Sequence, residues 1–248
     1  DVGFGKTEVA MRATMRMVEA GKQVAVLVPT TVLAMQHAER FTARFKPFDV
    51  RVELLSRFRS GSEIKNIHRD LLKGDIQVVV GTTQLLGKSV RYHDLGLLVV
   101  DEEHRYGVRQ KSRLSNLADG LDILSLSATP IPRTLQMGLT GMRSLSTITT
   151  PPAARLSVQT SLGKYSEARI RDAVMSELER KGQVFFVHNK VVEIEEMASQ
   201  LRELMPEVRI AVGHGQMEAV ELEDVLLRFM RREVDLLLSS TIIESGID

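Results

Sequence analysis

Residues 97–104 read Leu-Leu-Val-Val-Asp-Glu-Glu-His, an apolar run that ends in consecutive acidic side chains. A run this short, built from leucine and valine, is typical of a buried β-strand. Open α/β sheets bind their ligands at the carboxyl ends of their strands, which is where these acids stand. The run therefore predicts that Asp101 holds a Mg²⁺ ion and that Glu102 orients and deprotonates an attacking water. The alternative is a charged, solvated loop.

A glycine-rich turn precedes the first helical pattern, and residues 1–7 read Asp-Val-Gly-Phe-Gly-Lys-Thr. They match the end of a phosphate-binding P-loop, G-x-x-x-x-G-K-[S/T], whose first glycine would precede residue 1. In such a loop the backbone N–H groups and the helix N-terminus hold phosphates. We expect Gly3, Phe4, Gly5 and Lys6 to bind ATP, Lys6 to act in catalysis, and Thr7 to bind Mg²⁺. The alternative is a structural turn with a chance Gly-Lys-Thr.

Short apolar runs alternate with amphipathic stretches along the whole chain. The runs predicted to be strands are Val24–Val28, Val50–Leu55, Ile76–Val80, Leu97–Val100, Ile123–Leu126, Ser157–Thr160, Gln183–His188, Arg209–Val212 and Val234–Ser239. The stretches predicted to be helices are Glu8–Ala20, Val32–Phe45, Glu63–Leu72, Arg109–Leu117, Glu167–Arg180, Val192–Leu204 and Ala219–Arg231. This alternation predicts an α/β fold, with parallel sheets flanked by helices.

The segment Thr149–Arg155 reads Thr-Thr-Pro-Pro-Ala-Ala-Arg and interrupts the pattern. Consecutive prolines fix φ and remove N–H donors, so neither a helix nor a central strand can run through them. We therefore predict two domains, residues 1–150 and 151–248, the second of which looks incomplete. Both ends of the chain resemble the middle of a motif, and we expect it to be an internal fragment of a longer protein.

Composition excludes several classes of protein. The chain has no cysteine, which excludes disulfides and thiolate zinc sites, and its six histidines are scattered singly. There is no apolar run of about 18 residues and no secretory signal, so we expect a cytoplasmic protein without a membrane partner. Residues 1–150 carry a net charge of +6 and residues 151–248 carry −5. This asymmetry indicates a polyanion partner for the first half, or simply differing solvated helical faces.

Small hydroxyl side chains follow the predicted strand over residues 123–126, in the string Ser127-Ala128-Thr129-Pro130. Hydroxyls at a strand end can link a phosphate site to a moving part, which makes Ser127 and Thr129 candidate coupling residues. By itself the string is a weak turn signal. Its place after the acidic strand favours a nucleotide hydrolase. The alternatives are a P-loop phosphotransferase, which would need an acceptor-binding lid, and a nucleotide-gated module without turnover.

Six short motifs follow one another along the chain: Gly5-Lys6-Thr7, Pro29-Thr30-Thr31, Gly81-Thr82-Thr83, Asp101-Glu102-Glu103-His104, Ser127-Ala128-Thr129 and Thr241-Ile242-Ile243-Glu244-Ser245-Gly246-Ile247-Asp248. Their order resembles that of superfamily 2 helicases and translocases over essentially the whole chain. The resemblance implies two tandem RecA-like P-loop domains, with ATP between them and DNA crossing both. It also implies that Thr30, Thr31, Thr82 and Thr83 contact the DNA backbone.

Within this superfamily the chain is similar to the translocase module of the bacterial transcription-repair coupling factor family, notably at Ser56-Arg57-Phe58-Arg59-Ser60 and Asp101–Gly107. The alternative is the RecG branched-DNA helicase family, which usually has Asp-Glu-Gln-His and lacks the Ser-Arg-Phe-Arg-Ser string. The chain departs from the coupling-factor pattern at Tyr106, where Phe is usual, and at Ser245, where Thr is usual. Both substitutions retain size and polarity well enough to leave the resemblance in place.

The resemblance implies an ATP-driven motor that moves on double-stranded DNA and displaces stalled RNA polymerase. It implies that Gly246 and Asp248 face the nucleotide and that His104 couples ATP to DNA. Arg57 and Arg59, in a polar loop, are expected to contact DNA, although a solvated face is the alternative. The family also implies RNA polymerase and excision-repair proteins as partners, through regions outside this stretch. We expect the stretch alone to hydrolyse ATP weakly, because the family's transition-state arginines would follow residue 248.

Overall fold

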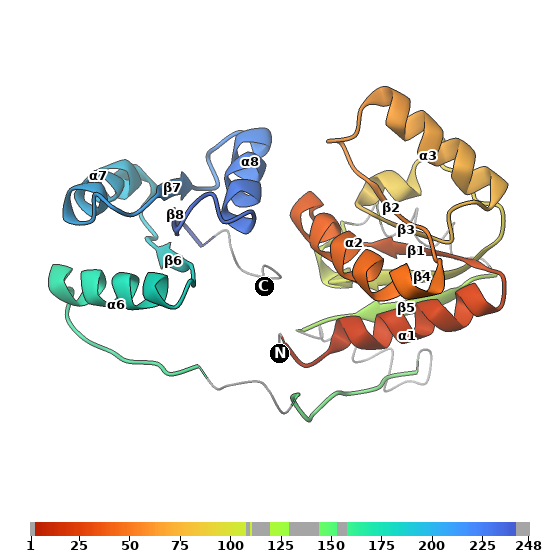
Figure 1. Cartoon of the computed structure of the whole chain (residues 1–248), viewed down its shortest axis with the longest axis horizontal. Helices are drawn as coiled ribbons and strands as arrows, with labels where there is room; N and C mark the ends of the chain where they lie inside the picture. Colours follow the sequence, from red (N-terminus) through yellow and green to blue (C-terminus); the bar gives the residue numbers. More distant parts are fainter. Residues whose placement is uncertain (1–2, 108–109, 111–119, 129–143, 153–157, 242–248) are drawn as a thin grey trace. The chain divides into compact units, whose positions relative to one another are not determined.

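The computed structural model describes residues 3–107, 110, 120–128, 144–152 and 158–241. The chain forms two compact units, Asp1–Leu156 (unit 1) and Ser157–Asp248 (unit 2). The domain boundary predicted around Thr149–Arg155 lies beside this division. Each unit is built on a parallel sheet that helices flank, which confirms the predicted α/β fold class (Figure 1).

Unit 1 alternates helices and strands in the order that the sequence predicts. Its helices are α1 (Lys6–Glu19), α2 (Thr31–Phe45) and α3 (Gly61–Lys73), with short 3₁₀ turns η1 (Lys46–Phe48), η2 (Thr83–Leu86) and η3 (Glu103–Arg105). Its strands are β1 (Gln23–Leu27), β2 (Val52–Leu55), β3 (Val78–Gly81), β4 (Leu95–Asp101) and β5 (Asp122–Leu126). The strands form one parallel sheet in the order β2-β3-β1-β4-β5.

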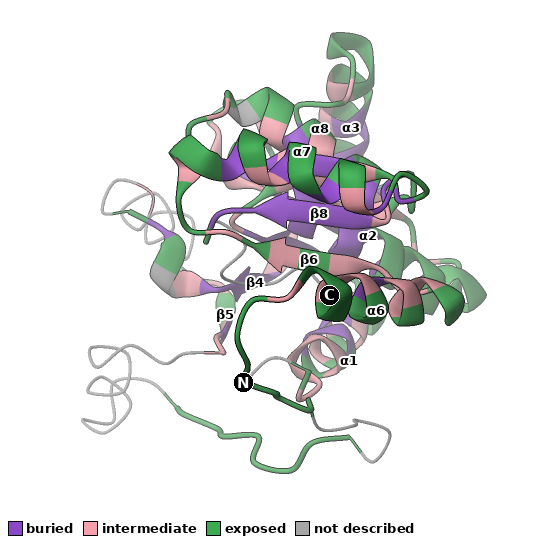
Figure 2. Cartoon of the chain, turned by 90° about the vertical axis from the view of Figure 1, so that its left-hand side faces the viewer, coloured by how far each residue is buried: buried purple, intermediate pink, exposed green. Residues whose placement is uncertain are grey.

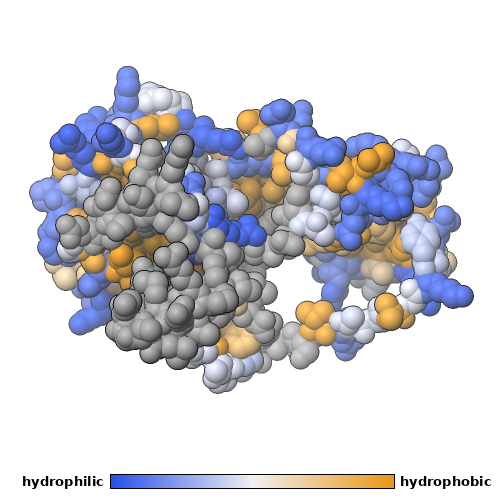
Figure 3. Space-filling view, turned by 180° about the vertical axis from the view of Figure 1, so that it is seen from behind, coloured by the Kyte–Doolittle hydropathy of each residue, from blue (hydrophilic) through white to orange (hydrophobic). Residues whose placement is uncertain are grey.

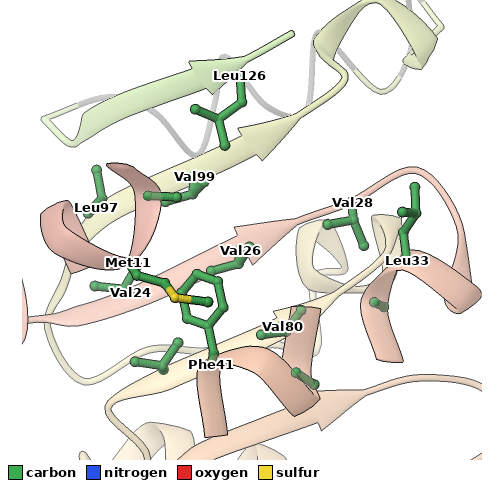
Figure 4. Close-up of a cluster of buried hydrophobic side chains, with 14 of the residues drawn as sticks. Met11, Val24, Val26, Val28, Leu33, Phe41, Val80, Leu97, Val99 and Leu126 are labelled. Carbon is green, nitrogen blue, oxygen red and sulfur yellow. The ribbon is translucent and has the colours of Figure 1, made fainter. Parts of the chain in front are cut away.

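Two apolar layers cover the two faces of this sheet. On one face, Val24 and Val26 of β1 pack with Met11 of α1 and with Leu33 and Phe41 of α2 (Figure 4). On the other face the alternate strand residues pack against α3 and η2. Both faces of the central strands are therefore apolar, and this explains why the strands read in the sequence as continuous hydrophobic runs.

Unit 2 repeats the alternation on a smaller scale. Its helices are α6 (Glu167–Glu179), α7 (Ile194–Leu204) and α8 (Ala219–Met230), with the 3₁₀ turn η4 (Val191–Glu193) before α7. Its strands β6 (Val184–Val187), β7 (Ile210–Gly213) and β8 (Leu236–Ser239) form a parallel sheet in the order β6-β8-β7. The central strand β8 is buried throughout, whereas the edge strand β6 alternates between intermediate and exposed residues (Figure 2).

The predicted elements agree with the observed ones in type, with ends that differ by one or two residues, in all but two cases. The strand predicted over Ser157–Thr160 is wrong, because residues 158–160 have no regular structure and Val158 is 87% exposed. A strand needs a neighbour that takes its backbone hydrogen bonds, and no strand of the described part of unit 2 pairs with these residues. The helix predicted over Arg109–Leu117 lies, apart from Gln110, outside the described residues.

Unit 2 exposes several large apolar side chains, including Phe185 and Val187 of β6 and Val192 of η4. The space-filling view accordingly shows hydrophobic side chains between hydrophilic ones on its surface (Figure 3). Within the described ranges, no helix combines the length and the apolar character that crossing a lipid bilayer requires.

Candidate nucleotide site

The strands of unit 1 run parallel, so the residues that follow them meet at one edge of the sheet. The register sets Leu27 at the end of β1 beside Gly81 of β3 and Val100 of β4, and Asp101 beside Leu126 of β5. Four of the candidate residues come shortly after these strand ends: Thr30, Thr82, Glu102 and Ser127. This is the edge at which open α/β sheets bind ligands, as the sequence predicts.

The N-terminus of α1 is shaped to receive an anion. Gly5, its N-cap, has φ 87°, a left-handed conformation that a side chain would strain. No side chain caps this 14-residue helix, so its first backbone N–H groups and its positive dipole end remain for a ligand. Lys6 and Thr7 are the first two residues of the helix. The arrangement supplies the backbone and the lysine that a phosphate site requires.

An ion pair joins this helix terminus to the acidic end of β4. Lys6 Nζ lies 3.1 Å from Glu102 Oε1, although the two residues are 96 positions apart in the sequence. Their side chains are 19% and 6% exposed, so water screens the pair little. The structure thus brings together two of the residues that the sequence singles out for catalysis.

Glu102 is held by its backbone as well as by its side chain. Its φ of 49° is left-handed, which is uncommon for a residue other than glycine and turns the chain sharply at the strand end. Its N–H group donates to the carbonyl of Leu126 at 2.9 Å and to Asp101 Oδ1 at 3.0 Å. The neighbouring strand β5 therefore helps to fix the backbone of Glu102, and with it the position from which the side chain extends.

Asp101 is buried and receives hydrogen bonds on both carboxylate oxygens. Besides the Glu102 N–H at Oδ1, the ring nitrogen Nε2 of His37 lies 3.1 Å from Oδ2. His37 belongs to α2 and is itself 6% exposed. The sequence gives no partner for this histidine. Its place in the apolar stripe of α2, between Leu33 and Phe41, is the one signal that could have suggested a buried partner.

A buried tyrosine lies close to the same two acids. Tyr106 is 4% exposed, and its hydroxyl has no hydrogen-bond partner among the described residues. Burial, with the negative charges of Asp101 and Glu102 nearby, raises the pKa of Tyr106 far above its ordinary range. The hydroxyl therefore stays protonated at any physiological pH and can only donate or accept a hydrogen bond there.

The predicted DNA-contact threonines stand at the starts of helical turns. The Thr30 hydroxyl accepts a hydrogen bond from the Leu33 N–H at 3.3 Å and so caps α2. Thr82 precedes η2, which begins at Thr83. Just before it, a Cβ on Gly81 would lie 2.7 Å from the carbonyl oxygen of Leu55, so close packing of β2 and β3 requires glycine.

The predicted DNA-contact arginines differ in their surroundings. Arg59 Nη1 donates to Glu63 Oε1 at 2.9 Å, while its other terminal nitrogen lies 3.7 Å from Glu53, so the guanidinium is tied to acids of its own unit. Arg57 instead lies over the ring of Phe58, 5.8 Å from its centroid. Phe58 is 46% exposed, and the arginine therefore stacks at the surface.

The Ser56–Ser60 motif, which contains both arginines, also has a structural role. The Ser60 hydroxyl and the Glu63 side chain form a capping box at the start of α3, each accepting from the backbone N–H of the other. The hydrogen bonds from Ser60, with help from Arg59, lower the pKa of Glu63 to about 2.

Four of the predicted site residues lie wholly or partly outside the described residues. The backbone of His104 lies in η3, but its side chain, with Thr129, Gly246 and Asp248, lies outside the described residues. Ser127 directly follows β5 and is partly buried, so the structure places this candidate at the same sheet edge as Glu102.

The chain resembles known proteins over both of its units. Residues 1–137 match the family model of the DEAD/DEAH box helicases, and residues 167–248 match the helicase conserved C-terminal domain. Over all 248 residues the chain is 52% identical to the transcription-repair-coupling factor of Escherichia coli (strain K12) and 51% identical to that of Staphylococcus haemolyticus (strain JCSC1435). It spans about a fifth of these curated relatives, 22% and 21% of their lengths.

A solved structure supports the same grouping. The chain is similar to RecG bound to a three-way DNA junction, with a TM-score of 0.77 and 35% identity, covering 100% of this chain and 33% of that one. With a family model matched over more than half of its length, the chain belongs to the DEAD/DEAH box helicases, a family of ATPase- and helicase-type enzymes, and is similar throughout to transcription-repair-coupling factors.

Proposed function

We propose that this chain is the ATP-hydrolysing motor of a double-stranded DNA translocase that acts in transcription-coupled DNA repair and displaces stalled RNA polymerase. The observation that carries the proposal is the contact of Lys6 with Glu102, next to Asp101, at the carboxyl edge of the sheet of unit 1. The identity of 52% with a transcription-repair-coupling factor supports the choice of process.

The residues of this edge fit ATP and Mg²⁺ as cofactors. The uncapped N-terminus of α1 and the flexible ammonium of Lys6 suit the phosphates, with Gly3, Phe4 and Gly5 as the loop that surrounds them. The hydroxyl of Thr7 and the carboxylate of Asp101 are hard oxygen ligands of the kind that Mg²⁺ prefers. When bound, the ion would neutralise charge that develops on the phosphates.

We propose an order in which these residues act, starting from the contact between Lys6 and Glu102. A phosphate near the start of α1 would offer Lys6 a stronger anionic partner than the Glu102 carboxylate. Lys6 would then turn from Glu102 to the phosphate, and Glu102 would be left to accept a proton from a water in line with the bond that breaks. In this scheme Lys6 binds and stabilises charge, Asp101 holds the metal, and Glu102 is the base.

The DNA interface proposed for unit 1 follows the same edge. Thr30, Thr31, Thr82 and Thr83 would contact phosphates through hydroxyls and the backbone N–H groups at the starts of α2 and η2. Arg57, which stacks on the exposed ring of Phe58, and Arg59, which Glu53 and Glu63 hold, would also contact phosphates. Arg59 would have to exchange those partners for DNA.

The remaining roles rest on the family resemblance. The state of the nucleotide would be coupled to DNA by His104, Ser127 and Thr129. The nucleotide would also be faced by two residues of unit 2, Gly246 and Asp248. RNA polymerase and excision-repair proteins would be the partners of the whole protein, and we propose that it acts in the cytoplasm. The chain spans about a fifth of its curated relatives, and we propose that regions outside this stretch would make these contacts.

A RecG-type branched-DNA helicase is the second candidate, favoured by the structural similarity to RecG on a three-way junction. The two candidates differ in their preferred substrate. A coupling factor should release RNA polymerase stalled on duplex DNA, whereas a RecG-type enzyme should unwind a three-way junction and leave the stalled polymerase bound. A gel-shift assay of each substrate with the intact protein and ATP distinguishes them.

The replacement Glu102→Gln tests the proposed chemistry. An amide keeps the size of the side chain but cannot accept the proton, so DNA-stimulated ATP hydrolysis by the intact protein should fall by about 10²–10⁴-fold while ATP binding persists. The matched control is Glu103→Gln, which alters the adjacent acid and leaves the proposed base in place. Unchanged turnover in Glu102→Gln would remove Glu102 as the base, and loss of turnover in both variants would point to damage of the whole loop.

A further inference from the structure

A buried histidine contacts the carboxylate that we assign to the metal. His37 Nε2 lies 3.1 Å from Asp101 Oδ2, and the two side chains are 7% and 12% exposed. A carboxylate can only accept hydrogen bonds, so the proton of this bond resides on Nε2. The other ring nitrogen, Nδ1, is buried and has no hydrogen-bond partner among the described residues.

Packing alone does not account for a histidine at this position. His37 lies on the apolar face of α2, where Leu33, Ala34, Phe41 and Phe45 fill the core, and its ring lies 6.2 Å from that of Phe41. Burying a polar nitrogen without a partner costs free energy that leucine or phenylalanine here would avoid. The interaction that can offset this cost is the hydrogen bond of the Nε2–H group, whose one described partner is Asp101.

The two hydrogen bonds on Asp101 come from different elements and fix its carboxylate. Oδ1 accepts from the Glu102 N–H at 3.0 Å, and Oδ2 accepts from α2 through His37. Held at both oxygens, the group cannot rotate about its side-chain torsions without breaking one bond. Each oxygen has a second lone pair, so the carboxylate can still bind a metal ion or its water. Partners of this kind orient metal ligands and typically change metal affinity by about 10–100-fold.

We propose that His37 is a positioning residue that orients Asp101 for Mg²⁺, so that the affinity of the site for magnesium-bound nucleotide depends on the Nε2–H group of His37. The inference rests on the proposed function, in which Asp101 is the magnesium ligand. It makes α2, whose first turn carries the proposed DNA contacts, a support of the metal site as well.

The test measures nucleotide binding by the intact protein rather than its turnover. A fluorescent ATP analogue is titrated at a series of Mg²⁺ concentrations and in EDTA. In His37→Leu, which removes the donor, the Mg²⁺ concentration for half-maximal binding should rise about 10–100-fold, while binding in EDTA stays as in the wild type. His37→Gln places an amide N–H near the position of Nε2 and should restore most of the magnesium dependence.

Two further variants separate positioning from stability. Phe41→Leu removes core volume on the same face of α2, one turn away, so it should lower the thermal stability but leave the magnesium requirement unchanged. In an Asp101→Asn background, His37→Leu should cause no further shift, because both act through one carboxylate.

Equal shifts in His37→Leu and Phe41→Leu, or no shift in His37→Leu, would show that His37 supports only the fold and would overturn the inference while leaving the proposed function standing. Failure of the wild-type protein to bind the analogue in a magnesium-dependent way would overturn the proposed function and the inference with it.

Discussion

The two units share one scaffold. In unit 1 the succession α1-β1-α2-β2-α3-β3 gives neighbouring strands in the order β1-β3-β2, and in unit 2 the succession α6-β6-α7-β7-α8-β8 gives β6-β8-β7. In both, the first two helices pack on one face of the sheet and the third packs on the other. The same three-layer arrangement is therefore built twice from sequences that differ widely.

A glutamine at the start of the first strand recurs in the same role. The Gln23 side-chain amide donates to the carbonyls of Leu71, at the end of α3, and Ile76, just before β3. Its counterpart Gln183 donates to the carbonyls of Phe229, at the end of α8, and Val234, before β8. Each amide joins the first strand to the third helix and third strand of its unit.

The difference between the units lies in what is added to the scaffold. Unit 1 has β4 and β5 beyond the shared three strands, and β4 brings Asp101 and Glu102 to the edge where α1 begins with Lys6. In unit 2, α6 begins after Ser166, whose hydroxyl accepts from the Arg169 N–H and caps the helix. An anion site at a helix N-terminus thus depends on leaving that terminus uncapped, and only unit 1 does so at its first helix.

Removing the shared glutamines should give the largest effects on stability. Gln23 is 4% exposed, and its carbonyl oxygen also accepts from the His93 and Asp94 N–H groups at 2.7 and 3.1 Å. Gln23→Leu would leave the Ile76 carbonyl and the Asp94 N–H without this partner, whereas the His93 N–H and the Leu71 carbonyl still bond each other at 3.2 Å. The change should lower the free energy of unfolding by roughly 3–5 kcal/mol. Gln183→Leu affects two carbonyls in a less buried place and should cost roughly 1–3 kcal/mol.

Urea unfolding followed by circular dichroism measures both changes. Gln200→Leu, at an exposed position of α7, is the control and should stay within about 0.5 kcal/mol of the wild type. A smaller loss for Gln23→Leu than for Gln183→Leu would contradict the view that the amide does more in unit 1.

The third helices differ in their caps, which predicts an effect of intermediate size. α3 has the capping box of Ser60 and Glu63, whereas the N-cap of α8, Glu218, makes no side-chain cap bond. Ser60→Ala should therefore destabilise unit 1 by about 1 kcal/mol, and Glu218→Ser should stabilise unit 2 by up to about 1 kcal/mol. Thermal unfolding of both variants measures these shifts, and the same sign in both would contradict the comparison.

The capping box also predicts how stability varies with pH. The pKa of Glu63 is lowered to about 2 in the folded chain, chiefly by the hydrogen bonds of Ser60. A lowered pKa means that the contribution to stability is complete above the ordinary value near 4.5 and is lost as the pH falls toward 2. Glu63→Gln keeps the cap but cannot titrate, so its stability should vary less than that of the wild type across this window.

The smallest predicted effect concerns the turn after the first helix. Gly21 has φ 77° after α1, and Lys181 adopts φ 60° after α6. A side chain is strained in this region, so Lys181→Gly should stabilise unit 2 by less than about 1 kcal/mol, while Gly21→Ala should cost unit 1 about 1 kcal/mol. A Cβ at Gly21 meets nothing within 4 Å, so the cost would be conformational rather than steric. Destabilisation by Lys181→Gly in urea would contradict this.

The sequence predicts the scaffold because the signals that define it are local. Valine-rich runs such as Val78–Gly81 mark buried strands, and Ser60 followed by Glu63 marks a helix start, whatever the rest of the chain does. Ser157–Thr160 shows the limit of such signals. Its composition fits a strand, but a strand also needs a neighbour, and pairing depends on the tertiary fold.

The positions of several candidate site residues were predictable for the same reason. Gly5, Lys6, Asp101 and Glu102 stand in motifs that are readable one at a time, and the parallel sheet brings them together. The bond of His37 to Asp101 was not predictable, since it spans 64 residues and depends on how α2 packs against the sheet. The ion pair of Arg59 with Glu53 was not predictable either, because it depends on how the loop before α3 folds back on β2.

The hydrogen bonds of Gln23 affect how the backbone amides of unit 1 exchange their hydrogens with water. The side chain of Gln23 bonds the end of α3, Ile76 in the segment before β3, and the two residues before β4. A fluctuation that frees any of these segments therefore weakens the hydrogen bonds of Gln23 to the others. The amide hydrogens of His93 and Asp94 belong to a connecting segment that would ordinarily exchange with water within seconds by local fraying. Because Gln23 accepts both, we expect them to exchange only when the central strands separate, as slowly as the amides of β1 itself.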